Sequence, residues 1–166
     1  NGLITQGGNL TVSGNAAINT VSYDWDGNGA ASNTVVDPGF TFTINSSVIE
    51  NDDASHGGIV TLNGSTLSVN TGAPWTKAST LAMNFNVIPA RVTGQTMILA
   101  GQIDATGGAE VIAPLRMGGG VVNVISSTLT QSGQFSSTAG GTLTKIGPGT
   151  WTISGTHSHG AGAVLA

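Results

Sequence analysis

The sequence predicts an all-β fold, in which one chain winds into a single-stranded β-solenoid, or β-helix, of about seven coils with negligible helix. Composition is the first reason, because the 166 residues include 26 glycines and only 7% are charged. Glycine costs about 1 kcal/mol per helical position relative to alanine, and the abundant Thr, Ser and Asn are also poor helix formers. Val, Ile and Thr fit a pleated strand surface. The composition therefore favours short strands joined by tight turns.

Alternating apolar packets are the second reason for this prediction. In each packet the large side chains fall on one face of a strand and the small polar side chains fall on the other. Glycine- and asparagine-bearing turns separate the packets at intervals of roughly eight to twelve residues. We expect coils of roughly 20 to 25 residues in one domain spanning residues 1–166, with residues 23–37 as a longer excursion from the coil. The packets with this pattern are residues 10–12, 40–44, 59–62, 67–69, 121–124 and 151–153.

The charges of the chain are few and dispersed. Its net charge is −4, and its four basic residues are Lys77, Arg91, Arg116 and Lys145. Nucleic-acid binding and a polybasic membrane-surface segment both require clustered cations, so we expect neither. No stretch approaches the roughly 18 apolar residues of a membrane helix, so we expect no membrane insertion of this segment. The absence of cysteine excludes disulfides and zinc–thiolate sites.

One segment near the end carries a recognisable motif. The segment is Leu143-Thr-Lys-Ile-Gly-Pro-Gly-Thr-Trp-Thr-Ile-Ser-Gly155, and it resembles the autotransporter-associated β-strand repeat. In that family a Lys precedes Gly-x-Gly-Thr. An apolar residue, a polar residue and a second apolar residue come next, and Ser-Gly ends the motif. The family continues with Asn and Tyr, where this chain has His157 and His159. Residues 143–166 are thus the best-matching repeat, and its matching positions are Lys145, Gly147, Gly149, Thr150, Trp151, Ile153, Ser154 and Gly155.

This resemblance implies a β-helical passenger-type protein that is extracellular or on a bacterial cell surface. The expected function is structural, as a stiff rod or a self-associating extracellular filament, with other cells or surface carbohydrate as further possible partners. Unpaired strand edges at the two ends of a solenoid favour end-to-end self-association. Trp25 and Trp75 lie in turn-rich segments and are candidate subunit-interface residues. Alternatively, they cover corners of the core, and Trp151 is predicted to face the interior by its position in a strand.

A calcium loop is the best candidate for a binding site. The segment from Asp24 has the spacing D-x-D-x-N-G, which places oxygen ligands from Asp24, Asp26 and Asn28 around a turn. A complete loop of this class ends with a bidentate Glu at its twelfth position, where this chain has Val35. The alternative is an ordinary Asp- and Asn-rich turn. Calcium is therefore the one cofactor to consider.

No catalytic residue is predicted, and we do not expect an enzyme. The alternative function is a β-helical carbohydrate-binding or polysaccharide-degrading protein. Its chemistry needs two carboxylates a few ångströms apart, and the available acids include Asp52, Asp53, Asp104 and Glu110. Adjacent Asp52 and Asp53 point to opposite faces of a strand, and only 5% of the chain is aromatic. The sequence thus contains little on which to build a catalytic cleft.

Overall fold

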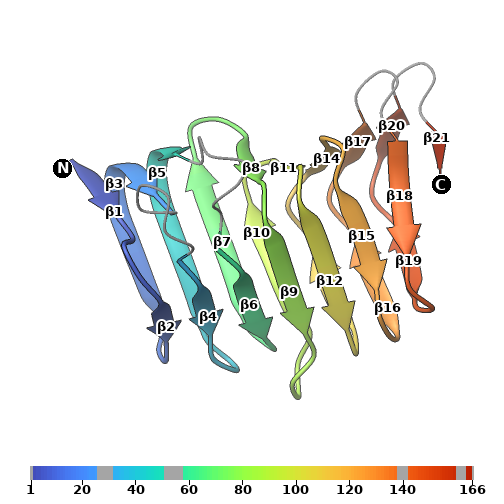
Figure 1. The fold of residues 1–166 in the computed structure, drawn as a ribbon, viewed down its shortest axis with the longest axis horizontal. Helices are drawn as coiled ribbons and strands as arrows, with labels where there is room; N and C mark the ends of the chain where they lie inside the picture. The colour runs from blue at the N-terminus through green and yellow to red at the C-terminus, as the bar shows by residue number, and fades with distance from the viewer. Residues whose placement is uncertain (1, 26–31, 51–57, 138–141, 160–163, 166) are drawn as a thin grey trace.

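The computed structural model describes residues 2–25, 32–50, 58–137, 142–159 and 164–165. These residues form parallel strands stacked in three rows along one axis, and they contain no helix. Figure 1 shows the strands following one another from the N-terminal end to the C-terminal end of an elongated molecule. The β-solenoid predicted from the sequence is therefore confirmed.

Two sheets of eight strands and one of five make up the rows, called sheets A, B and C. Sheet A contains β1 (Leu3–Thr5), β3 (Ala16–Asp24), β5 (Thr41–Glu50), β7 (Thr66–Thr71), β10 (Ala90–Gly94), β13 (Ala109–Val111), β16 (Thr128–Gln131) and β19 (Thr150–Ile153). Sheet B contains β2 (Leu10–Val12), β4 (Thr34–Val36), β6 (Val60–Asn63), β9 (Thr80–Asn84), β12 (Gln102–Thr106), β15 (Val121–Val124), β18 (Thr142–Ile146) and β21 (Val164–Leu165). Sheet C contains β8 (Trp75–Lys77), β11 (Met97–Leu99), β14 (Leu115–Met117), β17 (Phe135–Ser137) and β20 (His157–His159).

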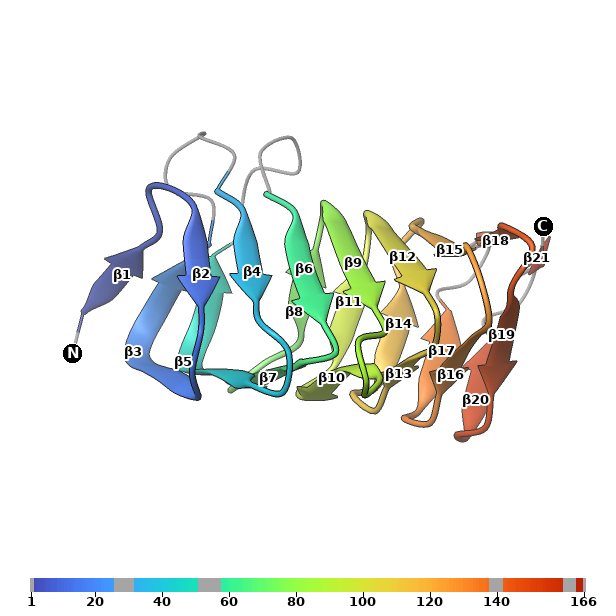
Figure 2. The ribbon, with the colours of Figure 1, turned by 90° about the horizontal axis from the view of Figure 1, so that it is seen from below.

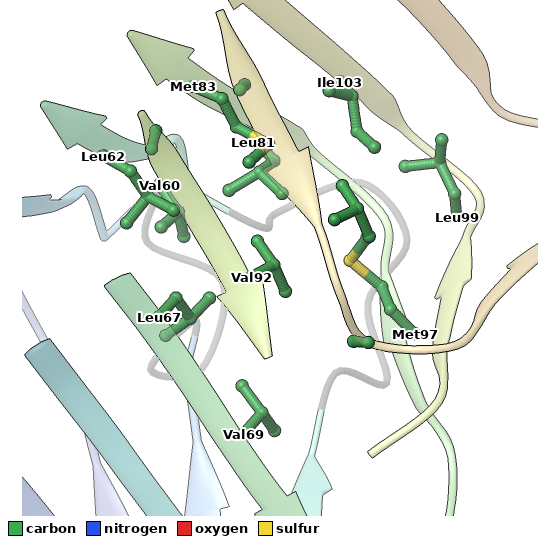
Figure 3. Packing of buried hydrophobic residues seen from close by; sticks show 14 of the residues in the cluster. Val60, Leu62, Leu67, Val69, Leu81, Met83, Val92, Met97, Leu99 and Ile103 are labelled. Atoms are coloured by element: carbon green, nitrogen blue, oxygen red, sulfur yellow. The ribbon is translucent and has the colours of Figure 1, made fainter. Parts of the chain in front are cut away.

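The core is a set of columns of inward side chains that run along the axis. Paired residues in neighbouring coils lie between 18 and 26 positions apart, as in Met97 with Leu115 and Asn19 with Asn45. Alternate side chains point inward, as the period of two predicts. Figure 3 shows side chains of sheets A, B and C meeting in this interior. One fully buried column in sheet B joins Val60, Leu81, Ile103 and Val122.

The first coils close their third side with long strands. The register between β3 and β5 skips Val21 and Ser47, and the residues after that break continue the pairing. Strand β1 pairs only with the second part of β3, from Ser22 to Asp24. The Ser46 hydroxyl lies 2.6 Å from the carbonyl oxygen of Val48 and so bonds to the backbone at this corner. The second parts of β3 and β5 therefore occupy the side that sheet C occupies in later coils, and Figure 2 shows both regions from below.

Strands occupy both ends of the expected excursion over residues 23–37, whereas its middle, residues 26–31, lies outside the described residues. Tyr23 and Asp24 are the last residues of β3, and Thr34–Val36 form β4. Tyr23 is buried because its side chain faces the interior, where it packs at 5.7 Å from the ring of Trp25. Both ends of the segment thus belong to the coil itself.

Gly94 is a position where the stacking of coils requires glycine. Its φ is +102°, and a Cβ atom there would lie 2.1 Å from the carbonyl oxygen of Val69 in the preceding coil. We predict that Gly94→Ala lowers the free energy of unfolding by about 2–3 kcal/mol. Both the positive φ at this position and the clash of the Cβ atom with the neighbouring backbone destabilise the folded variant. Gly8→Ala is the matched control, since a Cβ there meets nothing within 4 Å. Thermal or urea unfolding of both variants measures the difference, and equal stabilities would contradict the prediction.

Candidate functional site

The two ends of the solenoid are the candidate site for self-association, and the C-terminal coil has a mixed character. In sheet C, His157 pairs with Phe135 and His159 pairs with Ser137, so both histidines continue inward columns. Their rings lie 5.6 Å apart, and the ring of His159 lies 5.7 Å from that of Phe135. Both histidines are exposed. The inward column of sheet C, which is apolar in the preceding coils, therefore ends with the polar imidazole rings of these histidines.

Sheets A and B end differently from sheet C. In sheet A, Trp151 and Ile153 continue the inward columns and pack against the core, where the ring of Trp151 meets that of Phe135 edge-on at 5.2 Å. The interior position predicted for Trp151 is thus confirmed. In sheet B, Lys145 of β18 occupies the register position of buried Val122, and the last strand, β21, pairs with Thr142 and Leu143 of β18. At this end, sheet A therefore presents apolar side chains and sheet C presents two histidines, while β21 extends sheet B beyond part of β18.

The glycines of the repeat motif lie where the last two coils touch. Gly147 has a φ of +80°, and a Cβ atom there would lie 2.4 Å from the carbonyl oxygen of Val124. A Cβ at Gly149 or Gly155 would also come within 3 Å of a neighbouring coil. Lys145 donates a hydrogen bond from Nζ to the carbonyl oxygen of Gly147 at 2.6 Å. Thr150 pairs with Thr128 in sheet A. The motif therefore forms one corner and the strand after it.

The N-terminal end is a hollow with mainly apolar walls. It has a volume of about 290 Å³, and its lining includes Leu10, Val12, Ile18 and Phe42. These residues belong to the inward columns of β2, β3 and β5, and no strand precedes them on the side of the hollow within the described part of the chain. The two ends thus differ in chemistry, since the first is apolar and the second combines apolar and polar groups.

Comparison of the chain with protein-family models, with curated proteins and with solved structures finds no match. The resemblance of residues 143–155 to the autotransporter-associated repeat therefore stays a prediction. What the structure adds is the packing of this motif between two parallel coils, as described above.

The predicted calcium loop lies mostly outside the described residues. Asp24 is buried at the end of β3, whereas Asp26 and Asn28 fall in the segment that the structure does not describe. In the described part of the chain, no group of three or more His, Asp or Glu side chains is arranged to hold a metal ion. Calorimetric titration with calcium tests the site. Heat and a raised melting temperature would support the loop, and their absence would remove it.

Trp25 and Trp75 lie in the core rather than on the surface. Their side chains are 6% and 3% exposed, and their rings stack at 6.0 Å with an interplanar angle of 21°. The Nε1 group of Trp25 donates a hydrogen bond to Oγ1 of Thr34 at 3.1 Å. Both side chains belong to the interior of this chain, and their candidate role in a subunit interface stays a prediction. The alternative prediction, that they cover corners of the core, fits the observed packing.

Sequence reasoning missed the residue that packs beside these rings, Lys77. Its side chain is 5% exposed, and Nζ donates a hydrogen bond to the carbonyl oxygen of Gly58 at 3.0 Å and another to Oγ of Ser79. Nζ also lies 6.0 Å from the centroid of the Trp25 ring. Burial lowers the pKa of Lys77 to about 8. The alternation Trp-Thr-Lys in β8 was the available signal, since it places Lys77 on the same face as Trp75.

The acids and cations among the described residues are distributed over all three sheets. Asp104 lies in sheet B and Glu110 in sheet A, while Asp52 and Asp53 fall outside the described residues. Arg91 lies in sheet A, whereas Arg116 lies in sheet C. Within the described ranges, no helix is long and apolar enough to cross a membrane.

Proposed function

We propose that this chain is a structural module of a secreted or cell-surface protein, in which the β-solenoid acts as a stiff rod. The observation that carries the proposal is the continuity of the parallel ladders, because sheets A and B each run through eight strands. Each coil buries its apolar face only against its neighbours, so bending or separating coils costs axial hydrogen bonds and apolar contacts together. Stiffness along the axis follows from that coupling.

The surface composition supports the same proposal. With 7% charged residues, the rod has few ion pairs whose strength depends on salt, and one of them joins Arg91 to Glu110 at 3.2 Å. Surface pairs are screened within about 10 Å at 0.1 M salt, whereas buried apolar columns are not. A rod stabilised by its interior tolerates the varying ionic strength outside a cell. Extracellular or bacterial cell-surface placement is part of this proposal.

End-to-end self-association is the proposed mode of assembly. Strands β19 and β20 at one end, and β2 and the first part of β3 at the other, have one sheet neighbour each in the described part of the chain. An unpaired edge is a template for a further parallel strand. The apolar hollow around Leu10 and Ile18 would then cover Trp151 and Ile153 of another copy. Such a heterologous contact repeats without closing and produces a filament.

Negative-stain electron microscopy with sedimentation velocity tests both proposals. We expect rods that lengthen with protein concentration, and we expect Leu10→Lys to shorten them because it puts a charge into the hollow. Val87→Lys is the matched control, since Val87 is 87% exposed on a loop away from the ends. Short rods of constant length would contradict the filament and leave the proposal of a single stiff rod standing. Globular or flexible particles would contradict the rod itself.

A further inference from the structure

A groove with a volume of about 400 Å³ lies on the outer surface at the corner between sheets B and A. It spans three consecutive coils, because its walls come from the turns that join β9 to β10, β12 to β13 and β15 to β16. Its volume falls in the range of about 300–1,000 Å³ that is typical of small-molecule sites. The residues of its walls that matter for recognition are Phe85, Pro89, Glu110, Thr128 and Thr130.

Phe85 is an exposed aromatic residue held in a fixed position. Its side chain is 48% exposed, although most large aromatic residues of the chain are buried. Its backbone N–H donates to the carbonyl oxygen of Thr106 at 2.8 Å, and the next residues form a tight turn closed by two hydrogen bonds between Asn86 and Ile88. The side chain rests on Gly107 and Gly108, where Cβ atoms would lie 3.0 and 3.8 Å from it. The surface thus presents a positioned apolar ring.

Glu110 is a hydrogen-bonding group in the wall of the groove, and two neighbouring side chains hold it in place. Its Oε2 accepts a hydrogen bond from Nε of Arg91 at 3.2 Å, and its Oε1 accepts one from Oγ of Ser132 at 3.0 Å. A carboxylate has about four acceptor sites, so Glu110 retains capacity for a ligand beside these two hydrogen bonds. Thr130 pairs with Glu110 in the sheet and adds a hydroxyl to the same wall.

We propose that this groove binds a neutral oligosaccharide, with Phe85 against the apolar face of one sugar ring and with Glu110 and Thr130 on its hydroxyls. An aromatic ring beside planar polar groups matches a sugar, which has apolar faces and a rim of hydroxyls. The mutual pairing of Arg91 and Glu110 cancels their charges, and the chain carries a net charge of −4. Both facts favour a neutral ligand over an acidic one.

Binding without cleavage is the expected chemistry of this groove. Glycoside hydrolysis by the usual route needs two carboxyl groups about 5–9.5 Å apart on either side of the bond. Glu110 is the one acidic residue among the described residues that line the groove. This inference goes beyond the proposed structural function and does not depend on it, because the groove lies on the side of the rod and not at its ends.

Isothermal titration calorimetry with cellohexaose and maltohexaose tests the proposal, with trigalacturonate as the acidic comparison. We expect heat with at least one neutral hexasaccharide and shifted amide resonances at Gly107 and Gly108. Phe85→Ala should weaken binding at least about tenfold, which corresponds to about 1.4 kcal/mol. Glu110→Gln should weaken it several-fold while keeping the shape of the side chain.

Ile112→Ala is the matched control, because Ile112 is also exposed and lies two positions from Glu110 but does not line the groove. Melting temperatures within a few degrees of the unmodified protein check that each variant is folded. The absence of heat with both neutral probes, or an unchanged affinity in Phe85→Ala and Glu110→Gln, would overturn the proposal. Tighter binding of trigalacturonate would overturn the assignment to neutral sugars.

Discussion

Phe135→Ala should lower the free energy of unfolding by about 3–5 kcal/mol, because it removes a large, fully buried side chain from the core near the C-terminal end of the stack. Phe135 is fully buried in the inward column of sheet C, between Leu115 of the preceding coil and His157 of the next. Its ring also meets that of Trp151 edge-on at 5.2 Å. The cavity would therefore weaken contacts of sheets A and C together. Urea unfolding followed by circular dichroism measures the loss.

Phe85→Ala is the matched control for this change, since it deletes the same side chain from a half-exposed position. We expect a loss below about 1 kcal/mol there, because little buried apolar area is removed. Amide hydrogen exchange gives a sharper readout of Phe135→Ala. Since each coil contacts only its neighbours, protection should fall most in β16–β20 and least in β6 and β7. A uniform fall along the axis would contradict the stacking argument.

The alternation of side chains was the part of the fold that the sequence predicted well. In β6 and β15, for example, Val60 and Leu62 or Val122 and Val124 are separated by one polar residue, and all four are fully buried. A strand has no other arrangement that buries such a pair together. The division of the coil into three sheets was not predicted, because strands of three residues carry too little pattern to show where a corner falls.

Contacts between residues of different coils could not be predicted from the sequence, for a different reason. Arg91 meets Glu110 across 19 positions, whereas Asn19 meets Asn45 across 26, so the length of a coil changes along the chain. Without a constant repeat, spacing alone cannot align residues of different coils. The groove at Phe85 depends on the alignment of three coils, and the packing of Trp25 against Trp75 depends on a further alignment. Local motifs were readable, but sites built from several coils were not.

Lys77→Met should raise the free energy of unfolding at pH 7 by about 2 kcal/mol. Burial lowers the pKa of Lys77 from 10.5 to about 8. Below pH 8 the side chain is therefore charged in the folded protein, and the burial of this charge lowers the free energy of unfolding. A shift of this size corresponds to a loss of stability on the order of 3 kcal/mol. Lys77→Met removes this loss but also removes the hydrogen bonds of Nζ, so the expected gain is smaller. The carbonyl oxygen of Gly58 keeps a partner in the variant, because Ser79 also donates to it at 2.7 Å.

The dependence on pH distinguishes this effect from simple repacking. Between pH 8 and pH 10.5 the unfolded chain binds a proton at Lys77 that the folded chain has released, so stability rises with pH. Burial, reinforced by Asp24, raises the pKa of Tyr23 above its ordinary value of 10.0. The contribution of Tyr23 to the free energy of unfolding is therefore fully present below pH 10 and is lost as the pH increases further. We expect these two groups to place maximal stability near pH 10.

Unfolding curves between pH 7 and pH 11 test both groups separately. Lys77→Met should remove the rise between pH 8 and pH 10 and keep the fall above it, whereas Tyr23→Phe should do the reverse. Lys145→Met is the matched control, because Lys145 lies beside the corner between β18 and β19 with its Nζ bonded to an exposed carbonyl. A rise that persists in Lys77→Met would show that another group titrates. A variant less stable than the unmodified protein at pH 7 would mean that the contact of the ammonium group with Trp25 and its hydrogen bonds outweigh the cost of burying its charge.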